Sequence, residues 1–223
     1  MELSKIIAWL DRTLKIGDFS DVSNNGVQIS RTGNVVKKVA FGVDADVRTL
    51  KAAAKADAQL LVVHHGISWG GGIKKIAGGV YNVVKAAIDA NIALYAAHLP
   101  LDANHAYGNN YELARYLGLK SLKPAFEYHG NIIGVVGTLP NGKKVGVCSG
   151  GAGCHATDAK ELGCDLFITG EADWGETVAA ENIGMRMICA GHYLTETFGV
   201  RALAKAMARQ LGVKTAFLPR KDA

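Results

Sequence analysis

Runs of apolar residues with the length of buried strands alternate along the chain with segments of helical periodicity. The apolar runs lie at residues 35–43, 59–63, 92–97, 132–139, 144–149, 165–169 and 186–190, with a late run at 214–218. The helical segments lie near residues 4–14, 46–57, 80–90, 110–117, 155–163, 175–183 and 196–211. Strands that alternate with helices usually form a parallel sheet covered by those helices. The pattern therefore predicts an α/β fold.

The order of these elements repeats. In the first half, "KVAFGVDAD" is followed by a helix, by "ADAQLLVVHHG" and, after another helix, by "NIALYAAHLPLD". In the second half, "KVGVCSGGAG" is followed by a helix, by "LGCDLFITGE" and then by "GMRMICAGHYLTE". An internal duplication into two related α/β halves is expected, with residues 1–120 and residues 121–223 as the two domains. The segment 118–130 breaks the pattern and is expected to join them.

Composition narrows the class of protein. The chain has 223 residues with 27 glycines and four prolines, which suits many tight turns between strands and helices. Its net charge is +5, but the positive residues form only short pairs. Nucleic-acid binding is therefore not favoured as the main role, whereas a small anionic substrate fits the charge.

Neither a disulfide framework nor a membrane span is expected. Cys148, Cys154, Cys164 and Cys189 form no C-x-x-C motif and are expected to act as small buried hydrophobic residues. No stretch reaches 18 uninterrupted apolar residues, and the first residues form an amphipathic helix without a cleavage-site pattern. A cytoplasmic location is therefore expected.

Residue types that bind metal ions follow three of the apolar runs. They are His64 and His65, then His98 and Asp102, and then His192 and Glu196. In α/β proteins ligands gather beyond the carboxyl ends of strands, so these side chains are expected near one another. Histidine together with carboxylate suits zinc, manganese or iron. The pattern alone leaves a metal site and ordinary structural roles for these histidines equally open.

The spacing within each group adds detail. If a helix begins near His192, then Glu196 lies on the same face of that helix. Asp102 also follows His98 by four residues, but the intervening Pro100 favours a loop.

Five segments carry a resemblance to a known family: "DVSNNGVQI" (21–29), "VVHHGISWGG" (62–71), "YAAHLPLDANHAYGNN" (95–110), "CDLFITGEADW" (164–174) and "AGHYLTE" (190–196). Together they resemble the Nif-three-like proteins, often named GTP cyclohydrolase 1 type 2 homologues. The resemblance is collinear over nearly the whole chain. It implies two α/β domains, a dinuclear metal centre and, as in several members, a homohexamer in the shape of a ring.

The resemblance also implies a set of ligands for two divalent ions per subunit, such as Zn, Fe or Mn. His64 and His192 would bind one ion, His65 and Asp102 the other, and Glu196 would bridge them. Two adjacent histidines at a strand end point in different directions, as two neighbouring ions require. His98 would be a further ligand, a group that supports a ligand, or an acid or base in catalysis.

Two functions fit this set of residues. The first is metal-dependent hydrolysis of a small, nucleotide-like substrate, in line with the GTP cyclohydrolase 1 type 2 name. The alternative is a non-enzymatic metal chaperone, or a scaffold that binds a protein or nucleic acid. Several nearby residues have either a functional or a structural interpretation: Asn25, Asp44, Trp69, the Gly-rich segment 148–153, Glu171 and Asp173.

Overall fold

The computed structural model describes residues 1–220, which form two compact units. Of the described residues, the first unit contains 1–101 and 200–220, and the second contains 102–199. The sequence pattern placed the boundary at residues 120 and 121 instead. The structure differs because α5 (Asn109–Tyr116) packs on the second sheet through Tyr111 and Leu113, and because the end of the chain returns to the first sheet.

The first unit is built on a five-stranded sheet of mostly buried apolar strands. The strands are β1 (Gly26–Ile29), β2 (Lys38–Asp44), β3 (Leu60–His65), β4 (Ala93–Ala96) and β10 (Lys214–Phe217), in the order β1-β4-β3-β2-β10. β10, β2, β3 and β4 are parallel, whereas β1 runs antiparallel to β4. The carboxyl ends of the four parallel strands therefore lie at one edge of the sheet.

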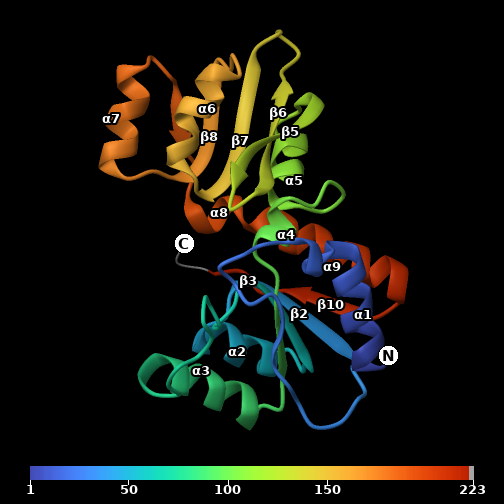
Figure 1. Cartoon of the computed structure of the whole chain (residues 1–223). Helices are drawn as coiled ribbons and strands as arrows, with labels where there is room; N and C mark the ends of the chain where they lie inside the picture. Colours follow the sequence, from blue (N-terminus) through green and yellow to red (C-terminus); the bar gives the residue numbers. More distant parts are fainter. Residues whose placement is uncertain (221–223) are drawn as a thin grey trace. The chain divides into compact units, whose positions relative to one another are not determined.

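Helices cover both faces of this sheet (Figure 1). On one face lie α2 (Val47–Lys55) and α3 (Gly78–Asp89), whose buried residues Leu50 and Ala87 join a core with Leu61 and Leu94. On the other face lie α1 (Leu3–Leu14) and α9 (Thr197–Leu211). The indole N–H of Trp9 donates to Gln210 Oε1 at 3.0 Å and ties these two helices together. A one-turn helix, η1 (Ile16–Asp18), follows α1.

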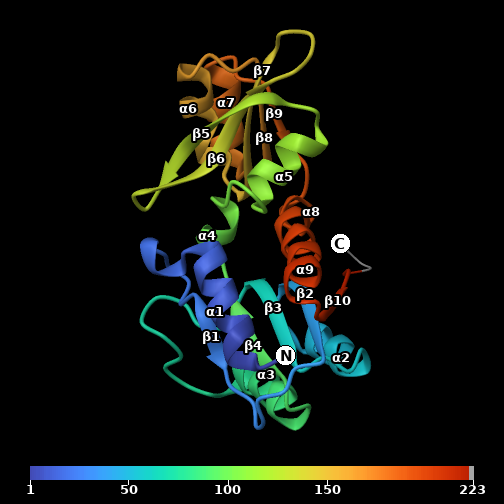
Figure 2. The same cartoon turned by 90° about the vertical axis from the view of Figure 1, so that its right-hand side faces the viewer.

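The second unit has its own five-stranded sheet. Its strands are β5 (Lys120–Tyr128), β6 (Asn131–Thr138), β7 (Lys144–Gly151), β8 (Leu166–Glu171) and β9 (Met187–Cys189), in sequence order across the sheet. The helix α5 lies on one face, and α6 (Ala156–Glu161) and α7 (Trp174–Asn182) lie on the other (Figures 1 and 2). Three short helices complete the described elements: α4 (Leu99–Asp102), η2 (Gly153–His155) and α8 (His192–Thr195).

The two units share one arrangement of strands. In the first, β2, β3 and β4 are adjacent and parallel, with α2 and α3 as the connecting helices. In the second, β7, β8 and β9 are adjacent and parallel, with α6 and α7 as the connections. The expected α/β fold with two related halves is confirmed.

Some local features differ from the sequence pattern. β1 was not predicted, and β5 occupies the segment that was expected to be a joint. Pro100 lies inside α4, where a loop was expected. Proline fits the first turn of a helix, because the N–H groups of that turn have no intrahelical acceptor and the missing N–H of proline costs no hydrogen bond. Cys154 and Cys189 are exposed rather than buried, and all four cysteines are free. Among residues 1–220, every helix is too short or too polar to cross a bilayer.

Candidate metal centre

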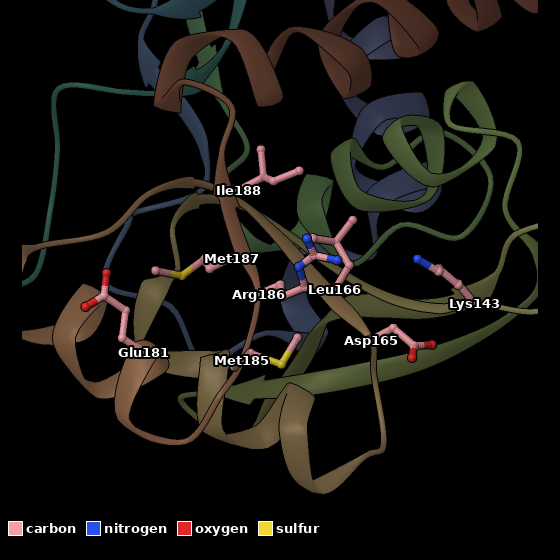
Figure 3. A pocket seen from close by; sticks show the side chains of 8 residues that line it. All are labelled: Lys143, Asp165, Leu166, Glu181, Met185, Arg186, Met187 and Ile188. Carbon is pink, nitrogen blue, oxygen red and sulfur yellow. The ribbon is translucent and has the colours of Figure 1, made fainter.

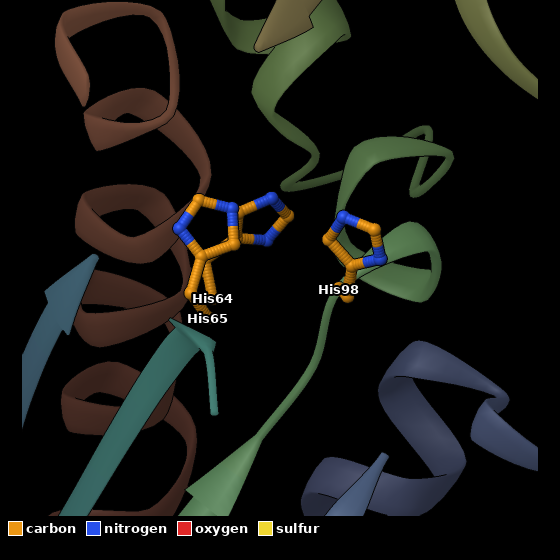
Figure 4. A group of neighbouring side chains, drawn as sticks. All are labelled: His64, His65 and His98. Atoms are coloured by element: carbon orange, nitrogen blue, oxygen red, sulfur yellow. The ribbon is translucent and has the colours of Figure 1, made fainter. Parts of the chain in front are cut away.

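Three histidines meet at the carboxyl edge of the first sheet (Figure 4). His64 and His65 end β3, and His98 follows the neighbouring strand β4. One ring nitrogen of each lies within 4.8 Å of the others. The ring centroids of His64 and His98 are 5.1 Å apart, and those of His65 and His98 are 5.8 Å apart. This is the spacing of side chains that could share a cation.

The adjacent pair His64 and His65 is held in two orientations. Their ring centroids are 4.6 Å apart and their planes are inclined by 47°. His64 is fully buried, whereas His65 is half-buried. Gly66 follows directly, and a Cβ there would overlap the side chains of Gln28 and Ala96. Only glycine therefore fits at residue 66, directly after the two imidazoles at the end of β3.

Each of the three histidines is hydrogen-bonded through Nδ1 to an oxygen acceptor. His64 bonds the carbonyl of Ala97 at 3.0 Å, His65 bonds Asp44 Oδ1 at 2.9 Å, and His98 bonds Asp21 Oδ1 at 2.9 Å. An acceptor at Nδ1 places the proton there and leaves the Nε2 lone pair for a metal ion. The three side chains therefore have the tautomer and orientation that a divalent cation needs.

Asp21 holds His98 from the segment 21–29, which carries part of the family resemblance, although Asp21 itself was not predicted as a site residue. Its carboxylate accepts from the backbone N–H groups of Ser23 and Leu99 at 3.0 Å and from Asn25 Nδ2 at 2.9 Å, besides His98. Burial opposes its ionisation, but the hydrogen bonds from His98 and the other donors outweigh that effect and lower the pKa of Asp21 to about 2. His98 thus contacts a permanent anion at neutral pH.

Replacing Asp21 with asparagine is expected to lower the free energy of unfolding by about 1–3 kcal/mol, because an amide cannot accept all these hydrogen bonds. Folding lowers the pKa from 3.8 to about 2, so the carboxylate's contribution is present above about pH 4 and is lost as the pH falls through about 2. Urea unfolding at pH 7 measures the change. Asp18→Asn, at an exposed position, is the control. Equal stability of the two variants would contradict the role of Asp21.

The second unit contributes another histidine with a carboxylate. His192 begins α8, and its Nε2 lies 3.1 Å from Glu196 Oε1, as expected for residues four apart at a helix start. Its Nδ1 bonds Glu171 Oε1 at 2.8 Å, at the end of β8. The hydrogen bond with Glu196, opposed by burial and reinforced by Glu171, raises the pKa of His192 to about 9. Metal binding at Nε2 would replace that proton.

A glycine lets the backbone of the second sheet approach this pair. Gly150 has a φ of +69°, and a Cβ there would lie 2.5 Å from Glu196 Oε1 and 3.4 Å from His192 Nε2. Its N–H donates to Thr195 Oγ1 at 3.1 Å. The Gly-rich segment 148–153 therefore forms one wall around Glu196, whose side chain is only 3% exposed.

Asp102 and Asp173 have different surroundings. Asp102 is buried, and its Oδ1 accepts from Asn109 Nδ2 at 2.8 Å and from Ser149 Oγ at 3.2 Å. These bonds orient a carboxylate that the sequence pattern grouped with His98. Asp173 forms a capping box with Glu176 at the start of α7, which is a structural role.

A cavity of about 560 Å³ lies at another part of the second unit (Figure 3). Its walls include Leu166 and Met187, which begin β8 and β9, together with the charged side chains of Lys143 and Arg186. Glu171 and His192, by contrast, follow the carboxyl ends of these strands. The cavity is therefore separate from the candidate ligands of this unit.

Comparisons with known proteins cover nearly the whole chain. A family model described as Duf34/NIF3 (NGG1p interacting factor 3) matches residues 1–144 and 131–223. A protein named GTP cyclohydrolase 1 type 2 homolog from Deinococcus radiodurans is 38% identical, with 96% of this chain and 91% of that protein aligned. One of the same name from Pyrococcus abyssi is 36% identical over 98% of each. The crystal structure of TTHA1606 from Thermus thermophilus matches with a TM-score of 0.85 and 31% identity, over 99% of this chain and 98% of that one.

Proposed function

Because the chain belongs to the Duf34/NIF3 family, we propose that it binds two divalent metal ions and hydrolyses a small, nucleotide-like substrate. One observation carries the proposal: His64, His65, His98 and His192 are each hydrogen-bonded through Nδ1 to an oxygen acceptor. Metal-ligating histidines almost always have this arrangement, because it orients the ring and leaves Nε2 for the ion.

The proposed ligands follow the family resemblance. In that assignment His64 and His192 would hold one ion, His65 and Asp102 the other, and Glu196 would contribute to both. Two such ions would supply a hydroxide at neutral pH and would stabilise negative charge on the reacting group. Asp44, Glu171 and Asn109 orient His65, His192 and Asp102 through the hydrogen bonds described above.

We assign proton transfer to His98. Its Nδ1 is held by the ionised carboxylate of Asp21, and its backbone N–H donates to Asn25 Oδ1 at 2.8 Å. The ring is therefore fixed in position, and Nε2 is the atom that accepts or returns a proton. A histidine held in this way by a carboxylate remains oriented while it changes protonation state.

The substrate class is supported by charge and by the names of relatives. The chain carries a net charge of +5, which suits an anionic substrate. The relatives named GTP cyclohydrolase 1 type 2 homolog make GTP the first compound to test.

The proposal predicts that the protein turns over GTP or a related phosphoester only when it is loaded with Mn²⁺, Fe²⁺ or Zn²⁺. His65→Ala should reduce the rate at least a hundredfold, because the ion that His65 is proposed to bind would then be weakly held. The other proposed ligands and the groups that orient them would remain. His129→Ala, an exposed histidine outside both groups, is the matched control. His64→Ala and His65→Ala should each lose a different one of the two ions and retain the other.

The measurement is product formation across a panel of nucleotides and phosphoesters, with metal content determined on the same samples. Absence of metal-dependent turnover on every compound would contradict hydrolysis. Full metal binding combined with that absence would favour the alternative function, a metal chaperone or scaffold.

A further inference from the structure

Trp69 lies beside the histidine group of the first unit without being buried by it. The loop that carries it follows β3 and leads to α3. Its indole centroid is 5.2 Å from the ring of His98, nearly edge-on at 76°, and 6.1 Å from the ring of His65. Trp69 is 38% exposed, whereas Trp9 in the core of the same unit is 7% exposed. A large aromatic surface is thus left open next to candidate ligands.

The ring is fixed before any ligand arrives. Its Nε1–H donates to the carbonyl of Gly66 at 3.0 Å, and the backbone of Trp69 forms a β-bridge with Ser23. The N–H of Gly70 donates to the carbonyl of Val22 at 2.6 Å. Since the only polar atom of the indole is already bonded, its exposed part is hydrocarbon and π-surface. A surface ordered in advance loses little conformational entropy on binding.

The loop after Trp69 has unfilled space next to its glycines and carries two exposed lysines. Gly70 and Gly72 have φ values of +51° and +85°, and a Cβ at either position would meet no atom within 4 Å. Lys74 and Lys75 follow on the same loop and are exposed. Among residues 1–220, neither lysine side chain forms a hydrogen bond or an ion pair. A planar ring on Trp69 would therefore have two ammonium groups available from the same loop.

We propose that Trp69, Lys74 and Lys75 form a subsite for a planar aromatic ring that carries a phosphate, as the base of a nucleotide does. The inference rests on the proposed function and names its substrate class. The indole centroid lies 5.2 Å from the ring of His98 and 6.1 Å from that of His65, within the range of direct aromatic contacts. Because Trp69 is this close to the histidine group, a ring stacked on its exposed part would lie near that group. The lysines attract the phosphate, and the indole selects for the ring.

The test compares GMP with ribose 5-phosphate, which lacks the ring, by titration calorimetry on the metal-loaded protein. Trp69→Ala should weaken GMP binding tenfold or more, which corresponds to about 1.4 kcal/mol. Trp69→Phe should retain most of the affinity, since phenylalanine also stacks. Trp174→Ala, at an 80% exposed tryptophan of the second unit, should have no effect. Lys74→Ala combined with Lys75→Ala should weaken both ligands.

Three results would overturn the subsite: equal GMP affinity in Trp69→Ala and the unaltered protein, equal affinity for GMP and ribose 5-phosphate, or no GMP binding at millimolar concentration. Metal content of Trp69→Ala should match that of the unaltered protein. Metal-dependent hydrolysis with Trp69-independent GMP binding would refute the subsite alone. Trp69-dependent GMP binding without metal-dependent hydrolysis would refute the proposed function and support the subsite.

Discussion

Replacing Glu196 with alanine is expected to reduce the metal content from about two equivalents per chain, the stoichiometry of a two-metal site, to nearly none. Glu196 is 3% exposed and contacts His192 Nε2 at 3.1 Å, so its carboxylate is already withdrawn from water. If it bridges both ions, as proposed, its loss affects both positions at once. Single replacement of His64 or His65 should instead leave part of the metal bound.

Elemental analysis of the desalted protein measures this effect, and circular dichroism shows whether the variant is folded. Glu181→Ala removes an exposed glutamate from α7 of the same unit and should leave the metal content unchanged. An unchanged metal content in Glu196→Ala would refute the bridging assignment. A loss of one equivalent only would assign Glu196 to a single ion.

Gly150→Ala should damage the same site without removing any ligand. The backbone at residue 150 has a φ of +69°, and the new Cβ would lie 2.5 Å from Glu196 Oε1. The left-handed conformation costs an L-residue about 1–3 kcal/mol, and relief of the overlap must move Glu196 or β7. We therefore expect a lower free energy of unfolding and at least a tenfold loss of metal affinity.

Gly151→Ala is a close control, because it adds the same methyl group to the neighbouring residue. A Cβ at residue 151 would lie 3.5 Å from Glu171 Oε1, which is ordinary van der Waals contact. Metal affinity and urea unfolding should therefore change much less than in Gly150→Ala. If the two variants bind metal equally well, the backbone at Gly150 does not position Glu196.

The strands that carry the histidine group could be predicted because a buried strand is recognisable in the sequence as an apolar run. β4 is buried along its whole length and β3 as far as His64, so both are apolar runs with a sharp change to histidine at or just after their ends. β8 is also buried over most of its length and ends in the exposed Glu171. The edge strand β5 carries no such signal, because it has the burial pattern of a half-exposed segment and contains Pro124. Its place depends on pairing with β6, which local sequence does not record.

The groups that orient the ligands were harder to predict than the ligands. Asp21 is separated from His98 by 77 residues, and Glu171 from His192 by 21. A carboxylate in a loop has many structural uses, and only the folded chain shows which histidine it contacts. Asp21 follows no apolar strand, so the reasoning from strand ends could not find it. Asp44 and Glu171 do end strands, and both were noticed without a partner being named.

The discontinuity of the first unit has a consequence for the order in which the chain folds during synthesis. The parallel partner of β2 at the sheet edge is β10, in which Lys214 pairs with Lys38. The first unit therefore remains without this strand and most of α9 until nearly all of the described chain has left the ribosome. The second unit is continuous from residue 102 to residue 199 and can complete its sheet earlier, although its synthesis begins later. Until β10 is synthesised, β2 is an edge strand whose unpaired backbone N–H and C=O groups are open to pairing with another chain.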